Sequence, residues 1–356
     1  MLDGLRGLPD ELQTLLLRAA LLDGDDALRA YSAWSPHIDL AKDVDGGTFR
    51  MLPLAYINLT RLGVRDPMLQ RMKSVYRYAW ADQQGQLQFA SEMGARIQAI
   101  GVPVLASKGI VLATAFYDSP ALRPMSDIDF AVSRENLPAT LKLLRGSGWR
   151  PEYNLDDPEF YDWFVRREHA IAMYHGKRQL DLHWQLFQEC LSHRTNALIW
   201  AAAVPLPLST VTLLRPCTPD LFLQACIHGL RPNPMPSFRW IADAVMILRK
   251  EGRAFDWDLL VDRARAVHVP WRLHFALTLL RRDFNQDIPE AVFSALQRGS
   301  RSWIERAEFD DALNRRSVMG ERLALAGRLA RGGRAGDVLL LARDFVRHRL
   351  PSRKLA

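Results

Sequence analysis

The chain has 356 residues, of which 48% are hydrophobic and 24% are charged. This length exceeds that of a typical single-core domain, so two or three domains are expected. The composition is that of an ordinary globular protein and excludes extended disorder. The three cysteines show no Cys-x-x-Cys spacing, which argues against a disulfide scaffold or a zinc site and favours a reducing compartment.

No segment reaches the roughly 18 apolar residues that a membrane-spanning helix needs. The first residues contain acids and no long apolar stretch, so no signal peptide is recognised. We therefore expect a cytoplasmic protein without a membrane span.

The net charge of +7 is concentrated at one end of the chain. Residues 301–356 contain thirteen Lys and Arg against seven Asp and Glu, so nearly all of the excess lies in this tail. The rest is close to neutral and has no basic stripe, so nucleic acid is not an expected partner. Arg recurs beside Leu and Ala at helical spacing in the tail, which indicates solvated helix faces. Contact with an acidic partner or an anionic membrane surface is the other interpretation.

The first hundred residues are predicted to be helical. Pro9-Asp10-Glu11 begins an amphipathic run that continues to Leu22. Asp66-Pro67 begins a longer run from Met68 to Ile100, which Gly101-Val102-Pro103 ends.

Between residues 101 and 212, short apolar runs alternate with helical ones. The expected strands and helices are 104–106, 109–117, 127–132 and 137–145, followed by a hairpin with strands 169–174 and 179–184. After Pro216 the pattern is helical again, over 221–230, 240–250 and 257–267.

This order predicts an α+β protein with a mixed β-sheet core flanked by helical regions. The expected domains are an N-terminal helical region (1–100), an α/β core (101–212) and a C-terminal helical region with the basic tail (213–356).

Two acids, Asp127 and Asp129, stand two residues apart in a predicted strand. Alternate side chains of a strand share a face, so both carboxylates would point the same way. At about 5–7 Å and an effective dielectric of about 20, their repulsion is on the order of 2–3 kcal/mol. A divalent cation between them removes this repulsion, since hard ions prefer oxygen ligands. Two surface acids at a strand end would give the same pattern.

The second hairpin strand adds Asp181 and His183, which alternate with apolar residues and so share one face. A third carboxylate predicts a site for two Mg²⁺ (or Mn²⁺) ions, the arrangement that serves phosphoryl transfer. His183 would orient Asp181 or contact a phosphate, unless it merely lies on a polar strand face.

Phosphate ligands are expected between the first predicted strand and its helix, at Ser107-Lys108-Gly109. A helix N-terminus offers free backbone N–H groups, and Lys108 adds a charge. Arg123, on a loop stiffened by Pro124, is a second candidate. Turn chemistry at Lys108-Gly109 and a surface ion pair at Arg123 are the simpler explanations.

Several of these residues together resemble the uncharacterised nucleotidyltransferases of the DNA polymerase β superfamily, over about residues 100–250: Lys108-Gly109, Tyr117, Arg123, Asp127-Ile128-Asp129, Asp181-Leu182-His183-Trp184 and the segments 225–229 and 239–243. The resemblance implies a nucleotidyltransferase core in which Asp127, Asp129 and Asp181 match the metal-binding acids. The superfamily usually has Gly-Ser or Gly-Gly where this chain has Lys108-Gly109.

Three residues of the C-terminal helical segments, His228, Arg239 and Asp243, are candidates for a substrate cleft above the acids. Arg239 and Asp243 are four residues apart, so an ion pair within one helix is the simpler explanation. His228 precedes a glycine and would then be a capping or core histidine.

The predicted reaction transfers a nucleoside monophosphate from an NTP, expected to be ATP, to a hydroxyl of an unknown small-molecule, peptide or protein acceptor. Asp181 would act as the general base or as the group that orients the acceptor. A non-catalytic nucleotide- or partner-binding protein with the same fold is favoured by Lys108-Gly109 and opposed by the three acids. A metal-dependent hydrolase that also uses His183 and His228 is a third possibility, without the histidine spacing usual for such sites.

Overall fold

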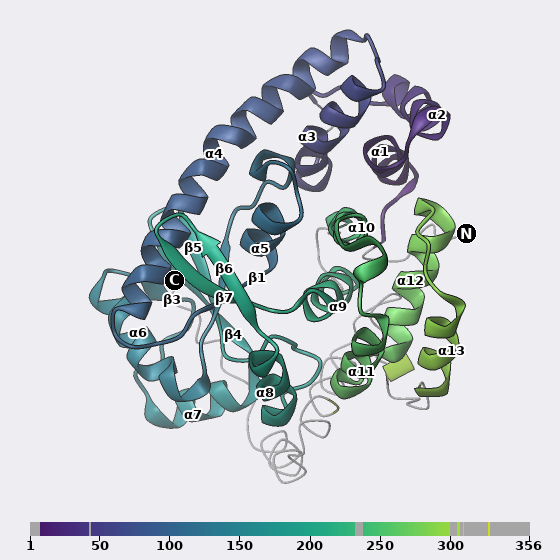
Figure 1. Ribbon diagram of the computed structural model, residues 1–356. Helices are drawn as coiled ribbons and strands as arrows, with labels where there is room; N and C mark the ends of the chain where they lie inside the picture. Colours follow the sequence, from purple (N-terminus) through teal and green to yellow (C-terminus); the bar gives the residue numbers. More distant parts are fainter. Residues whose placement is uncertain are drawn as a thin grey trace, which may run out of the picture.

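The computed structural model describes residues 8–42, 44–231 and 238–299, together with four residues further along, Glu305, Arg306, Phe309 and Gly327. The described residues form thirteen α-helices and one seven-stranded mixed sheet, which confirms the predicted α+β class (Figure 1). The helices predicted in the basic tail, 301–356, lie almost entirely outside the described residues. In the part of the chain that is described, no helix is both long and apolar enough to cross a membrane.

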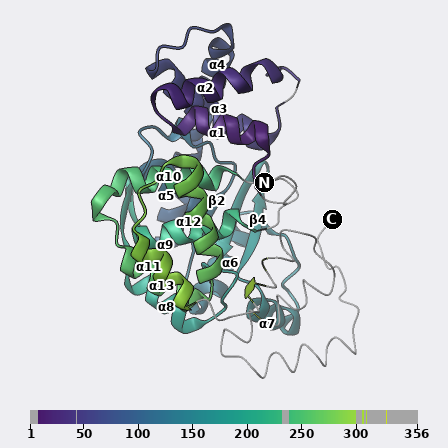
Figure 2. The same ribbon diagram turned by 90° about the vertical axis from the view of Figure 1, so that its right-hand side faces the viewer.

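Four helices form the N-terminal region: α1 (Glu11–Leu21), α2 (Gly24–Trp34), α3 (Gly46–Arg61) and α4 (Pro67–Gln98). The helix starts follow from the sequence, because Asp10, Asp45 and Asp66 each accept a backbone N–H of the first turn. The helices α1 to α3 lie at one end of the molecule (Figure 2). From there α4 extends to the sheet and contacts β7 (Val211–Arg215) (Figure 1).

The sheet has the strand order β3-β4-β5-β2-β1-β7-β6. Its strands are β1 (Leu105–Ser107), β2 (Ile128–Ala131), β3 (Arg150–Pro151), β4 (Ala170–His175), β5 (Arg178–His183), β6 (Val204–Leu208) and β7. β2 pairs in parallel with β5 and antiparallel with β1, while β1 pairs in parallel with β7. The predicted hairpin of residues 169–184 is confirmed as β4 and β5.

A second hairpin, formed by β6 and β7, was not predicted from the sequence. Pro205 and Pro207 lie within β6 and disrupt the usual strand pattern, but β6 is an edge strand, where proline is tolerated. β7 ends at Arg215, immediately before Pro216.

Four of the remaining helices lie between the strands in the sequence: α5 (Lys108–Ala115), α6 (Leu137–Gly146), α7 (Pro158–Arg167) and α8 (His193–Ala201). The other five pack on one another as the C-terminal bundle: α9 (Thr218–Gly229), α10 (Arg239–Glu251), α11 (Trp257–Val267), α12 (Pro270–Phe284) and α13 (Glu290–Gly299). The short helix α5 contacts β1, β2 and α9, so it joins the sheet to the bundle. Every residue of β1 and β2 is buried, as expected for strands at the centre of the sheet.

The helices α9 and α10 pack closely at Gly229. A Cβ atom at this position would lie 2.0 Å from Cγ of Trp240, which is less than any real contact distance. Trp240 is itself 3% exposed, so its ring has little room to move away. The absence of a side chain at residue 229 therefore sets the spacing of the two helices.

We expect Gly229→Ala to lower the free energy of unfolding by about 1–3 kcal/mol, because the new methyl group overpacks the contact with Trp240. Urea unfolding followed by circular dichroism measures this change. The matched control is Gly85→Ala in α4, where no atom lies within 4 Å of the added Cβ. This control should be neutral or stabilising by up to about 1 kcal/mol. Equal stability of the Gly229→Ala variant and the wild type would contradict the proposed packing constraint.

Candidate active site

Three polar side chains form a row across the central strands. Ser107 of β1 lies opposite Asp129 of β2, and Asp129 lies opposite Asp181 of β5. Residues directly opposite one another on paired strands project to the same face of the sheet. The register of two strand pairs therefore places both carboxylates side by side.

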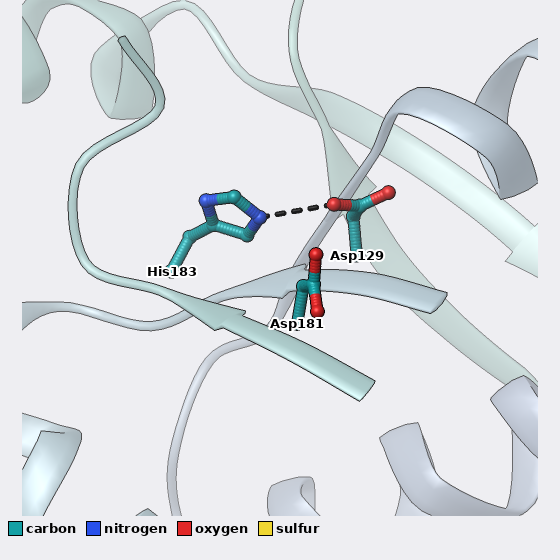
Figure 3. Close-up of side chains that lie close together, drawn as sticks. All are labelled: Asp129, Asp181 and His183. Atoms are coloured by element: carbon teal, nitrogen blue, oxygen red, sulfur yellow. Dashed lines mark hydrogen bonds and ion pairs between the residues drawn. The ribbon is translucent and has the colours of Figure 1, made fainter. Parts of the chain in front are cut away.

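His183 joins these two acids, since it follows Asp181 by two residues on β5. Asp129, Asp181 and His183 each offer a ligand atom, and these atoms all lie within 4.8 Å of one another (Figure 3). The Nε2 atom of His183 lies 3.0 Å from Oδ1 of Asp129. The predicted shared face of Asp181 and His183 is therefore confirmed, but the ring contacts Asp129 rather than Asp181.

Lys108 provides a positive charge at the same place. Its Nζ atom donates to Oδ1 of Asp129 at 2.5 Å, and the two side chains are 18% and 4% exposed. Lys108 is the first residue of α5 and has a φ of 45°, which is uncommon for a residue other than glycine. The Lys-Gly turn thus directs an ammonium group to the acids of the sheet.

The two carboxylates differ in their electrostatic surroundings. Burial alone would raise the pKa of Asp129, but Lys108 and His183 hold that pKa well below its usual range. The pKa of Asp181 is raised, by burial and by the neighbouring charge of Asp129. Asp181 also accepts a hydrogen bond from Nε2 of Gln179 at 2.9 Å. A further cation beside Asp181 would relieve this excess of negative charge.

Asp127 lies immediately before β2 and is half-buried. It lines the same pocket as Asp129 and Asp181. Within the described residues, however, the group whose ligand atoms lie within 4.8 Å of one another does not include it. The structure thus brings two of the three predicted acids together and places Asp127 in the adjoining pocket wall.

The pocket extends from the sheet face to the helices α3, α5, α9 and α10. His228, Arg239 and Asp243, the residues predicted to form a cleft, all line it together with the acids. Burial and the charges of Arg231 and Lys108 hold the pKa of His228 well below its usual value, so its imidazole is neutral near pH 7. The helical wall therefore presents an uncharged ring at this point.

The partner of Asp243 is Arg123 rather than Arg239, which corrects the expected ion pair within one helix. Arg123 donates from Nε and Nη2 to the two carboxylate oxygens at 2.8 and 2.9 Å, and both side chains are 5% exposed. Tyr117 also donates its hydroxyl to Asp243 at 2.8 Å. Burial and the Asp243 charge raise the pKa of Tyr117, which keeps this donor protonated. The surface ion pair considered for Arg123 is thus a buried, bidentate one.

Arg123 lies beneath the start of α5. A Cβ atom at Gly109 would be 3.1 Å from its Nη1 atom, which has no hydrogen-bond partner among the described residues. The bidentate pair with Asp243 therefore fixes the guanidinium of Arg123 directly behind the Lys108-Gly109 turn.

Two further arginines line the pocket without an ion-paired carboxylate among the residues described. Nη2 of Arg50, on α3, donates to Oγ of Ser126 at 3.3 Å, and Nη1 of Arg239 donates to the carbonyl of Pro124. Burial and the nearby Arg123 lower the pKa of Arg239 to about 10, so it still carries its charge at neutral pH. Sequence reasoning missed Arg50, because nothing in an amphipathic helix marks one arginine as facing a distant strand.

A family model described as uncharacterised nucleotidyltransferase matches residues 48–285, about two thirds of the chain. The chain therefore belongs to this nucleotidyltransferase family, as its resemblance to such proteins implied. The matched region contains Arg50, both acids of the central strands and the helical wall of the pocket. No curated protein and no solved structure matches the chain.

We expect Asp243→Asn to lower the free energy of unfolding by about 3–5 kcal/mol, because it leaves the Arg123 guanidinium buried without a counter-ion. Chemical unfolding at neutral pH measures the loss. The matched control is Asp262→Asn, whose carboxylate is 72% exposed and pairs with Arg265 at the surface. That control should lose less than about 1 kcal/mol. Similar small losses in both variants would show that the buried pair does not stabilise the fold as described.

Proposed function

We propose that this protein is a divalent-metal-dependent nucleotidyltransferase. It transfers a nucleoside monophosphate from an NTP, with ATP as the expected donor, to a hydroxyl of a small-molecule, peptide or protein acceptor. The observation that carries this proposal is the register of Asp129 with Asp181 on adjacent buried strands. These acids line a pocket that arginines also line, in a chain of a nucleotidyltransferase family.

The acids form the metal end of the pocket. Asp129 and Asp181 would hold Mg²⁺ or Mn²⁺, with Asp127 in the adjoining wall, because hard divalent ions prefer carboxylate oxygens. The pKa of Asp181 is raised by burial and by the neighbouring charge of Asp129, and a cation bound between the two acids would offset both effects. The bound ion would neutralise charge on the phosphoryl oxygens.

The arginines form the phosphate end. Arg50 and Arg239 have no ion-paired carboxylate among the described residues, so a triphosphate would supply their missing counter-charge. The first N–H groups of α5, at Lys108 and Gly109, have no partner within the helix and add positive potential. Nη1 of Arg123 lies close to Gly109, but the bidentate pair with Asp243 compensates the charge of this guanidinium.

Asp181 is suited to the role of general base. Its half-buried carboxylate lines the pocket, where an acceptor hydroxyl can approach it. The acceptor oxygen forms a bond to the α-phosphorus, the bond from that phosphorus to the bridging oxygen breaks, and pyrophosphate leaves. The hydroxyl proton passes to Asp181. The neutral His228 lines the same pocket.

A non-catalytic nucleotide-binding protein is the second candidate. The contact that favours it is the ion pair of Lys108 with Asp129, which already neutralises one of the acids. Such a protein would bind nucleotide in the same pocket without transferring any part of it.

Incubation with each α-labelled NTP and Mg²⁺ or Mn²⁺, in an extract that supplies acceptors, tests the proposal. We expect label transfer by the wild type and a loss of at least about 100-fold in Asp129→Asn and Asp181→Asn, because each removes a charge that the reaction requires. The control is Asp118→Asn, an exposed acid outside the pocket, which should retain full activity.

Other results would favour other functions. Transfer that survives both substitutions would show that these acids are not the site. Nucleotide binding without transfer would favour the non-catalytic protein, and release of free nucleoside monophosphate would favour a hydrolase.

The phosphate end generates a separate prediction. We expect Arg50→Ala to weaken equilibrium binding of Mg–ATP by about tenfold, the loss that follows from removing one charged hydrogen bond. Isothermal titration calorimetry measures it. Arg65→Ala, at an exposed position outside the pocket, is the control and should bind normally. Unchanged affinity of the Arg50→Ala variant would place the phosphates elsewhere.

A further inference from the structure

The side chain of Lys108 occupies the carboxylate that a metal ion would use. We propose that Lys108 is a built-in cation of the site, which pairs with Asp129 until a divalent ion and a nucleotide bind together. Its ammonium then moves to the phosphates. This inference rests on the proposed metal and nucleotide site, but it concerns how the site is held before either ligand arrives.

One oxygen atom is central to this inference. Oδ1 of Asp129 is 2.5 Å from the Lys108 ammonium and 3.0 Å from Nε2 of His183. Two protein groups therefore already occupy it, and Asp129 is 3% exposed. A divalent ion bound between Asp129 and Asp181 would lie beside this ammonium, and the two positive charges would repel strongly in a buried environment. The ion and the Lys108 contact thus compete for Asp129.

The position of Lys108 also allows its ammonium group to reach a second partner, the phosphates of a bound nucleotide. It is the first residue of α5 and lines the pocket that contains Arg50 and Arg239. Four flexible methylene groups separate its charge from the backbone. Rotation about these bonds would carry the ammonium from Asp129 toward bound phosphate without movement of the helix. The phosphate oxygens would then replace the Asp129 carboxylate as the negative partner of the Lys108 ammonium.

The backbone at Lys108 is consistent with a requirement for this side chain. A φ of 45° is readily adopted by glycine but disfavoured for residues with a Cβ atom. A lysine held in this conformation persists only where the surrounding structure imposes it. The short ion pair with Asp129 holds the Lys108 side chain in place here.

Two consequences distinguish this arrangement from a simple phosphate-binding lysine. Metal alone should bind weakly to the wild type, because it must displace the ammonium. Removal of the lysine should tighten metal binding but weaken nucleotide binding. Removal of a lysine that only binds phosphate would weaken nucleotide binding without tightening metal binding.

The test is Mn²⁺ binding to the full-length protein in the absence of nucleotide. Electron paramagnetic resonance measures the concentration of free Mn²⁺ and hence the affinity. We expect Lys108→Met to bind Mn²⁺ at least about tenfold more tightly than the wild type. Mg–ATP affinity, measured by calorimetry, should fall by about tenfold in the same variant. Lys142→Met, at an exposed position on α6, is the control and should change neither affinity.

Lys108→Gly is the second variant, since glycine suits the backbone at this position and also removes the charge. Mn²⁺ affinity that is unchanged or weaker in the folded variants would overturn the inference. Tighter Mn²⁺ binding in either one supports it, even if no nucleotidyl transfer is detected. Transfer by the wild type together with unchanged Mn²⁺ affinity would leave the proposed function intact and remove only this role of Lys108.

Discussion

The parallel pairing of β2 with β5 is the constraint on which the site depends. It sets Asp129 opposite Asp181, although 52 residues separate them in the chain. Two like charges on neighbouring buried strands disfavour the sheet unless positive groups compensate them. Lys108 and His183 supply that compensation for Asp129, while Asp181 retains an excess of negative charge. The same pairing that completes the hydrophobic core therefore creates a place where a cation is favoured.

A second buried interaction fixes the approach to these acids. The bidentate pair of Arg123 with Asp243 joins the segment before Asp127 to α10 of the C-terminal bundle. A buried ion pair contributes little net stability, because both charges lose their hydration, but removing one partner is strongly unfavourable. Its effect is therefore positional. It holds the strand that carries Asp129 at a fixed distance from the helical wall of the pocket.

Much of the fold and part of the site could be predicted from local signals. Period-two alternation identified the shared face of Asp181 and His183, and capping aspartates identified the starts of α1 and α4. The contacts that could not be predicted join distant segments. Nothing local shows that Asp243 pairs with Arg123, 120 residues earlier, or that Arg50 faces the pocket. The edge strand β6 was obscured by its prolines, whose tolerance depends on a position in the sheet that the sequence does not state.

The walls of the pocket come from three separate stretches of the chain. Arg50 belongs to α3, the acids to the central strands, and His228 and Arg239 to α9 and α10. The regions defined by secondary structure are therefore not units of function, since each alone carries only a fraction of the cavity. During synthesis, the acids of β2 and β5 are made well before the helices that enclose them. The site is therefore complete only once α9 and α10 have packed against α5 and α3.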